Sequence, residues 1–173
     1  MIKKIKEKQN NTDIEKYIFI LLIIAYISGI ISGCCFIFKN PDNIELTKYL
    51  TLNNTTTNTT TFVIYLISAF LLKYSGILCG FICFLPFLNG IQNSVYYSKN
   101  LLFSKDINLY LNIINAIKDT ATSLLLILYL IVIISQIIYR KYNIKKDLKY
   151  FSAYIVSSIL IYIMHLLLIR CIF

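Results

Sequence analysis

Charged residues are scarce in this chain. Only 14% of its 173 residues are Asp, Glu, Lys or Arg, whereas 58% are hydrophobic. A soluble domain carries roughly a quarter of charged residues, because charge covers its surface. The hydrophobic residues also come in long blocks, and a block of about 18 or more matches the length that a bilayer core requires. The composition therefore excludes an ordinary soluble domain and predicts one membrane domain.

Acidic side chains are few, and their positions argue against the common classes of membrane enzyme. All eight lie in expected loops or at the ends of apolar blocks: Glu7, Asp13, Glu15, Asp42, Glu45, Asp106, Asp119 and Asp147. The sequence contains no HExxH motif, no paired intramembrane aspartates and no Gly-rich phosphate loop. We therefore expect a protein that is not an enzyme and binds no cofactor.

Metal-binding patterns are also missing. The five cysteines all lie in apolar segments, and none forms a CxxC pair with a histidine nearby (Cys34, Cys35, Cys79, Cys83 and Cys171). We expect them to behave as small hydrophobic residues and predict no metal site. The single histidine, His165, lies deep in the last apolar block. An ionisable residue inside a membrane is a functional candidate, but no second ionisable residue is close in sequence, so the simpler interpretation is a hydrogen-bonded structural histidine.

The net charge of +9 is concentrated beside the apolar blocks. Two short segments hold ten of the basic residues: Lys3, Lys4, Lys6, Lys8 and Lys16 in the first, and Arg140, Lys141, Lys145, Lys146 and Lys149 in the second. Short basic segments beside spans stay on the cytoplasmic side and attract anionic lipid headgroups. Because the clusters flank spans and carry no groove-reading motif, we expect membrane lipids and no nucleic acid as partners.

The apolar blocks predict an all-α, polytopic helical membrane protein with about five transmembrane helices. A basic cytoplasmic segment, residues 1–16, precedes one helical membrane domain, residues 17–173. The expected spans are 17–38, 62–75, 76–97, 121–139 and 150–169, with an outer loop at 39–61. Between the third and fourth spans, residues 107–117 interleave asparagines with apolar residues, which is typical of an amphipathic interfacial helix.

Charge and parity constrain the central block, residues 62–97. Both basic segments are expected inside, so an even number of crossings must separate them. The central block then supplies either two short crossings or a hairpin that enters the membrane partway. We favour two crossings, in an integral plasma-membrane protein with its N-terminus in the cytoplasm and its C-terminus outside.

Small and polar residues mark the candidate functional positions. Small residues spaced four apart let helices pack closely in lipid. Two such pairs are candidate helix-packing positions: Gly29 with Gly33, and Gly76 with Gly80. A proline and a polar run predict a break in the central block, at Pro86, Asn89 and Gly90. The candidate intramembrane polar residues are Lys73, Gln92, Asn93 and His165.

This order of features resembles the stage II sporulation protein M family of endospore-forming bacteria. The likeness rests on Ile-Ser-Gly-Ile-Ile-Ser-Gly at 27–33, on Gly-Ile-Leu-Cys-Gly-Phe-Ile-Cys-Phe-Leu-Pro-Phe-Leu-Asn-Gly at 76–90, and on two C-terminal spans around a basic loop. The matching motif positions are Gly29, Gly33, Gly76, Gly80, Pro86, Asn89 and Gly90. The resemblance implies close helix packing and a shaped central break at these residues.

The resemblance also implies a role. It predicts a non-enzymatic membrane scaffold of sporulation engulfment, which anchors or localises peptidoglycan hydrolases at the septal membrane and could form an oligomer. The alternative is a small transporter or the permease subunit of an exporter. A transporter predicts one mid-membrane polar cavity that gathers Lys73, Asn89, Gln92, Asn93 and His165. A scaffold predicts these groups at helix interfaces, with the packing glycines in contact.

Overall fold

Five long helices make up the described part of the chain in a computed structural model, which covers residues 2–39, 57–75, 81–103, 109–140 and 143–172. They are α1 (Ile2–Lys39), α3 (Thr57–Tyr74), α4 (Phe84–Phe103), α5 (Leu109–Ile138) and α6 (Ile144–Ile172). No strand occurs in these ranges, which confirms the predicted all-α fold. Most of the expected outer loop, residues 40–56, lies outside the described residues.

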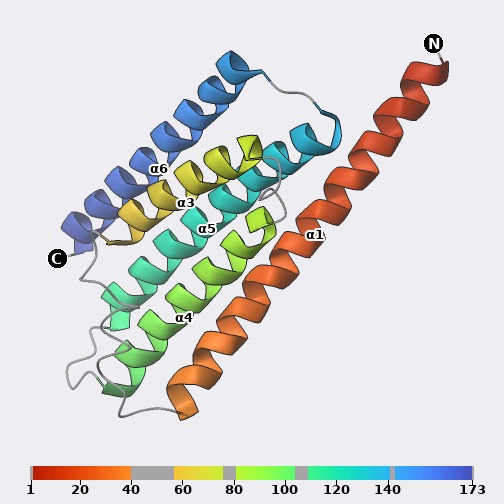
Figure 1. Ribbon diagram of the computed structural model, residues 1–173. Coiled ribbons are helices and arrows are strands. Elements are labelled where there is room, and N and C mark those ends of the chain that lie inside the picture. The colour runs from red at the N-terminus through yellow and green to blue at the C-terminus, as the bar shows by residue number, and fades with distance from the viewer. Residues whose placement is uncertain (1, 40–56, 76–80, 104–108, 141–142, 173) are drawn as a thin grey trace.

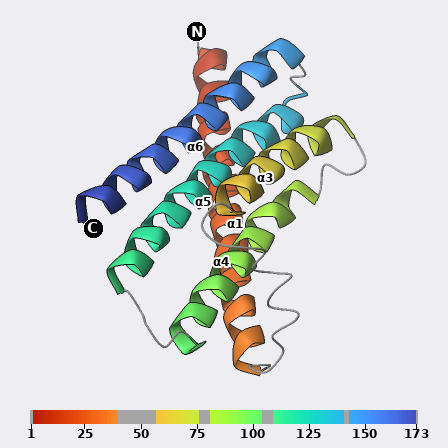
Figure 2. The same cartoon turned by 90° about the vertical axis from the view of Figure 1, so that its left-hand side faces the viewer.

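Successive helices run in opposite directions, as Figures 1 and 2 show. The first residues of α1, the end of α5 and the start of α6 therefore lie at one end of the bundle, and the C-terminus lies at the other. We call the end that contains the start of α1, the end of α5 and the start of α6 the basic end, because Arg140, Lys145, Lys146 and Lys149 lie there. Four antiparallel helices, α1, α3, α4 and α5, therefore separate the start of the chain from the second basic segment, and the two lie at the same end of the bundle.

Three of the helices are long and apolar enough to cross a membrane: residues Asp13–Lys39 of α1, Leu111–Ile138 of α5 and Ile144–Cys171 of α6. The apolar part of α3, Thr61–Tyr74, is shorter. The predicted interfacial helix at 107–117 is wrong over its described part, because α5 begins at Leu109 and continues unbroken to Ile138. Asn112 and Asn115 lie inside this helix, and the side chain of Asn115 is buried and hydrogen-bonded to His165 of α6.

The central block forms two antiparallel helices, α3 and α4, rather than one long helix. The boundary predicted between residues 75 and 76 agrees with the end of α3 at Tyr74, but the break predicted at Pro86, Asn89 and Gly90 does not occur. Pro86 lies in the first turn of α4, and Asn89 and Gly90 lie within the helix, so the interruption comes before Phe84. Proline is tolerated in a first turn because its missing N–H would have no intrahelical acceptor there. Accordingly, the span predicted at 76–97 gives way to a helix at 84–103.

The core is centred on α5, which packs against each of the other four helices. Its buried residues on successive turns are Leu126, Ile127, Tyr129, Leu130 and Ile133. The outer surface is also strongly apolar, with large exposed side chains on every helix whose side chains are described. Such a surface would be costly in water but is the ordinary surface of a helix in lipid.

Candidate functional site

Three glycines bring α1 and α4 into backbone contact. A Cβ atom added at Gly29 would lie 2.1 Å from the carbonyl oxygen of Phe87, and one added at Gly33 would lie 2.8 Å from that of Ile91. From the other side, a Cβ at Gly90 would lie 2.3 Å from the carbonyl oxygen of Tyr26. No side chain fits at these distances, so the helices approach this closely only because all three residues are glycine.

The contact gives Gly29 and Gly33 the packing role that their spacing predicted. It gives Gly90 the same role, in place of the break that the sequence indicated. Gly76 and Gly80 lie outside the described residues. The sequence pattern identified a close-packing face on the first helix but did not identify its partner, because a single glycine inside α4 carries no spacing signal.

Lys73 forms the most buried charged contact. Its ammonium group lies 2.5 Å from a carboxylate oxygen of Asp147 and donates a hydrogen bond of 2.6 Å to Gln136. The hydroxyl of Tyr74 donates to the same carboxylate oxygen. Lys73 and Asp147 are only 1% and 2% exposed. This contact joins the end of α3 to the start of α6, where each charge also opposes the dipole of its own helix.

A second polar contact joins α4 to α5 and α1. The side-chain amides of Asn89 and Asn93 both donate to the hydroxyl of Ser123, at 2.8 and 3.1 Å. That hydroxyl donates in turn to the backbone carbonyl of Asp119, at 2.7 Å. Asn93 also donates to the hydroxyl of Tyr26 on α1, at 3.2 Å. The two asparagines are therefore helix-joining residues.

Gln92 points to a third helix. Its carboxamide oxygen accepts a hydrogen bond of 3.2 Å from the hydroxyl of Tyr65, and its nitrogen donates one of 3.4 Å to Thr61. Both partners belong to α3. Successive polar residues of α4 thus join this helix to different neighbours, since Gln92 turns toward α3 while Asn93 turns toward α5 and α1.

His165 is buried and joins α6 to α5. A ring nitrogen, Nε2, lies 2.8 Å from the side-chain oxygen of Asn115. One turn further along α5, Asp119 accepts a hydrogen bond from the hydroxyl of Tyr97 and lies 3.2 Å from the ammonium group of Lys118. These contacts support the structural interpretation of the histidine over a catalytic one.

The buried residues of α6 form one stripe. Asp147, Ser158 and His165 are buried, and Phe151 and Tyr154 pack their rings against Tyr129 of α5. The other described residues of this helix are more exposed than these three, and most of its large apolar side chains point outward. Polar groups therefore attach α6 to the bundle at both of its ends, with aromatic rings between them.

Two cavities are formed by residues that the structure describes, and neither of them gathers the candidate polar residues. Asn93 lines a cavity of about 290 Å³ between α1, α4 and α5, together with Tyr26, Tyr97 and Asp119. Neither that cavity nor a larger one at the basic end is lined by Lys73, Asn89, Gln92 or His165. Each of these four residues contacts a different helix pair or a different level of the bundle.

No group of three or more His, Cys, Asp or Glu side chains that could hold a metal ion occurs within the described ranges. Asp147, Gln136, Ser123 and Asn115 are the partners that sequence reasoning missed. A charge or amide inside an apolar block indicates that a partner exists, but it does not indicate which residue tens of positions away supplies it. Comparisons with protein-family models, curated proteins and solved structures give no match to this chain.

Proposed function

We propose that the protein is a non-enzymatic integral membrane scaffold. The observation that carries this proposal is that the buried polar side chains form hydrogen bonds between helices. The contact between Gly29, Gly33 and Gly90 has the same effect. A bundle held in this way is rigid and keeps most of its outer surface available, which suits a protein that positions partners in a membrane.

A transporter is the alternative, and it needs a polar route at mid-membrane. The residues that would have lined such a route are Lys73, Asn89, Gln92, Asn93 and His165. Asn89 and Asn93 share Ser123 of α5 as a partner, and the other three contact different partners at other helix interfaces. This distribution supports the scaffold over the transporter.

The specific form of the proposal comes from the resemblance to the stage II sporulation protein M family. In that form the scaffold anchors peptidoglycan hydrolases at the septal membrane during engulfment. We expect the tagged full-length protein, cross-linked in sporulating cells and purified in detergent, to retain cell-wall hydrolases that an unrelated five-span protein does not retain. If no hydrolase is enriched, the proposed role in anchoring peptidoglycan hydrolases is contradicted. If the purified protein transports a solute in proteoliposomes, the scaffold proposal is contradicted and the transporter alternative is supported.

We further propose that the basic end faces the cytoplasm and the C-terminus faces outward. In a cysteine-free background, we expect Lys16→Cys and Lys145→Cys to be labelled only after the membrane is opened. Asn54→Cys, and Cys171 when it alone is restored to this background, should react with an impermeant maleimide on intact cells. The reason is that short segments rich in lysine and arginine are retained inside. Labelling of positions 54 and 145 from the same side would contradict a five-span arrangement.

A further inference from the structure

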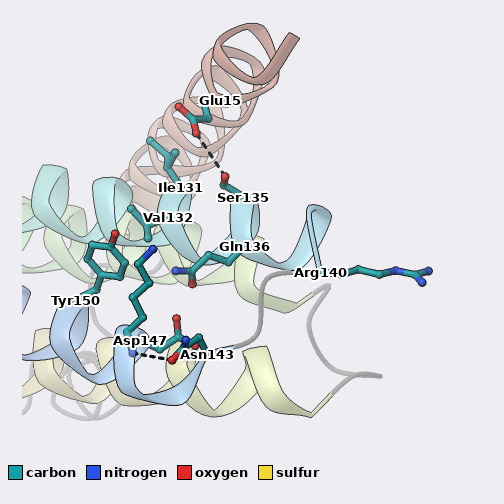
Figure 3. Close-up of a pocket in the computed structure, with 10 residues that line it drawn as sticks. Glu15, Ile131, Val132, Ser135, Gln136, Arg140, Asn143, Asp147 and Tyr150 are labelled. Atoms are coloured by element: carbon teal, nitrogen blue, oxygen red, sulfur yellow. Dashed lines mark hydrogen bonds between the residues drawn. The ribbon is translucent and has the colours of Figure 1, made fainter. Parts of the chain in front are cut away.

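A cavity of about 650 Å³ lies at the basic end, over α5 and between α1 and α6 (Figure 3). Its walls come from three helices and the turn after α5, and include Glu15, Val132, Gln136, Arg140, Lys146 and Asp147. Across it, Glu15 of α1 accepts a hydrogen bond of 3.4 Å from Ser135 of α5. The cavity is therefore a crevice between two helices that both pack on a third.

Charge in this crevice favours an anion at its rim. Arg140 and Lys146 are both exposed, and Arg140 extends outward at the edge of the cavity in Figure 3. Asp147 contributes little repulsion, because its carboxylate is paired with the ammonium group of Lys73 at 2.5 Å. Glu15 is the one other acidic residue among those that line the crevice. Two flexible cations at the mouth can approach a phosphate group from two directions.

The backbone at Arg140 is unusual. Its φ of 51° lies in the left-handed region, at the position after a helix where glycine or asparagine is favoured. An arginine there is strained, and strained residues cluster at functional sites. The strained turn also fixes the point from which the arginine side chain leaves the end of α5.

An apolar path leads from the crevice toward the middle of the bundle. Val132 lines the crevice and is half-buried, and Leu128 and Leu124 follow on the same face of α5 at intervals of four residues. Both leucines are 48% exposed. Eight residues of helix extend about 12 Å, which is long enough to support much of an acyl chain.

We propose that this crevice is a binding site for one anionic phospholipid. The phosphate group contacts Arg140 and Lys146 at the basic end, and an acyl chain follows Val132, Leu128 and Leu124 between α1 and α6. Basic pockets between membrane helices bind anionic headgroups in this manner. A free phosphate ion would use the rim alone, whereas a phospholipid uses both the charged rim and the apolar path.

The experiment titrates the purified full-length protein in detergent with dioleoyl phosphatidylglycerol. Dioleoyl phosphatidylcholine and inorganic phosphate serve as parallel probes, and the readouts are the thermal unfolding midpoint and lipid adducts in native mass spectrometry. We expect phosphatidylglycerol to raise the midpoint by several degrees and to form a 1:1 adduct. The double variant Arg140→Gln/Lys146→Gln should bind this lipid about 25-fold more weakly, at about fivefold for each basic residue.

The matched control is Lys145→Gln/Lys149→Gln. Both of its residues are exposed in the same segment and do not line the crevice, and the change in net charge is the same. We expect its affinity to stay within about threefold of the parent, because diffuse surface charge is a weaker attraction than two contacts at one phosphate. Equal losses in the two double variants would overturn the site.

Two further variants separate lipid binding from folding. Arg140→Gly relieves the left-handed backbone, so it should keep or raise the lipid-free midpoint while it reduces the shift caused by phosphatidylglycerol. Leu128→Gln interrupts the apolar path and should weaken the lipid adduct without affecting the charged rim. An equal response to phosphatidylcholine would contradict an anionic ligand, and a full response to inorganic phosphate would contradict a lipid.

Discussion

Asp147→Asn is expected to destabilise the protein by about 3–5 kcal/mol, because it leaves the buried ammonium group of Lys73 without a counter-charge. Lys73→Met should cost a similar amount, since it strands the carboxylate instead. In the double variant Lys73→Met/Asp147→Asn neither charge remains, so the loss should fall to about 1–2 kcal/mol. Reversible unfolding in mixed micelles measures all three values.

The pair between Asp13 and Lys16 provides the control. It has a nitrogen-to-oxygen distance of 3.7 Å, but both side chains are more than half exposed. Asp13→Asn/Lys16→Gln should therefore change stability by less than about 1 kcal/mol. If the losses of Lys73→Met and Asp147→Asn simply add in their double variant, the two residues do not form the coupled pair described above.

Gly33→Leu is expected to cost about 3 kcal/mol or more and to separate α1 from α4. The new side chain would begin 2.8 Å from the carbonyl oxygen of Ile91, and backbone atoms cannot move aside as a flexible side chain can. Disulfide cross-linking between cysteines introduced at the end of each helix would report the separation, and unfolding in micelles would report the loss of stability.

The matched control is Ser32→Leu, one residue away. Ser32 is exposed, and its hydroxyl donates only to the backbone of its own helix at Ser28. A leucine there should face lipid and change stability by less than about 0.5 kcal/mol. If Ser32→Leu were as damaging as Gly33→Leu, the added bulk would act through general insertion into the membrane rather than through the contact between α1 and α4.

The length of the apolar blocks predicted the all-α fold, for a physical reason that is local. Apolar length revealed the helices, and the basic residues at both 1–16 and 140–149 required an even number of crossings between them. Helix ends were harder to predict. Pro86 suggested a break at its own position, although proline fits a first turn as well as it fits an interruption. Asn115 suggested an interfacial helix, because the sequence does not reveal that His165 meets it fifty residues later.

For the polar contacts, the sequence predicts that a buried charge has a partner but does not identify that partner. Because burying an unpaired charge is costly, Lys73 in an apolar block predicts a polar or acidic partner for its ammonium group. Which group compensates it depends on how α3 and α6 lie relative to each other. Asp147 lies in the basic segment 140–149, which the sequence predicts to be a cytoplasmic loop. Its buried contact with Lys73 was therefore not predicted. Gly90 was missed as a packing residue for a similar reason, since its contact lies on another helix.

The stripe on α6 has a consequence for how the last helix joins the bundle. Asp147 and His165 are eighteen residues apart, which corresponds to about five whole turns, so both face the same direction. Their partners lie on α3 and α5, which are synthesised earlier. If α6 were displaced along its axis by one turn, about 5.4 Å, both groups would lose their partners together. Two widely separated polar contacts therefore define a single axial register for a helix whose apolar surface would otherwise slide freely in lipid.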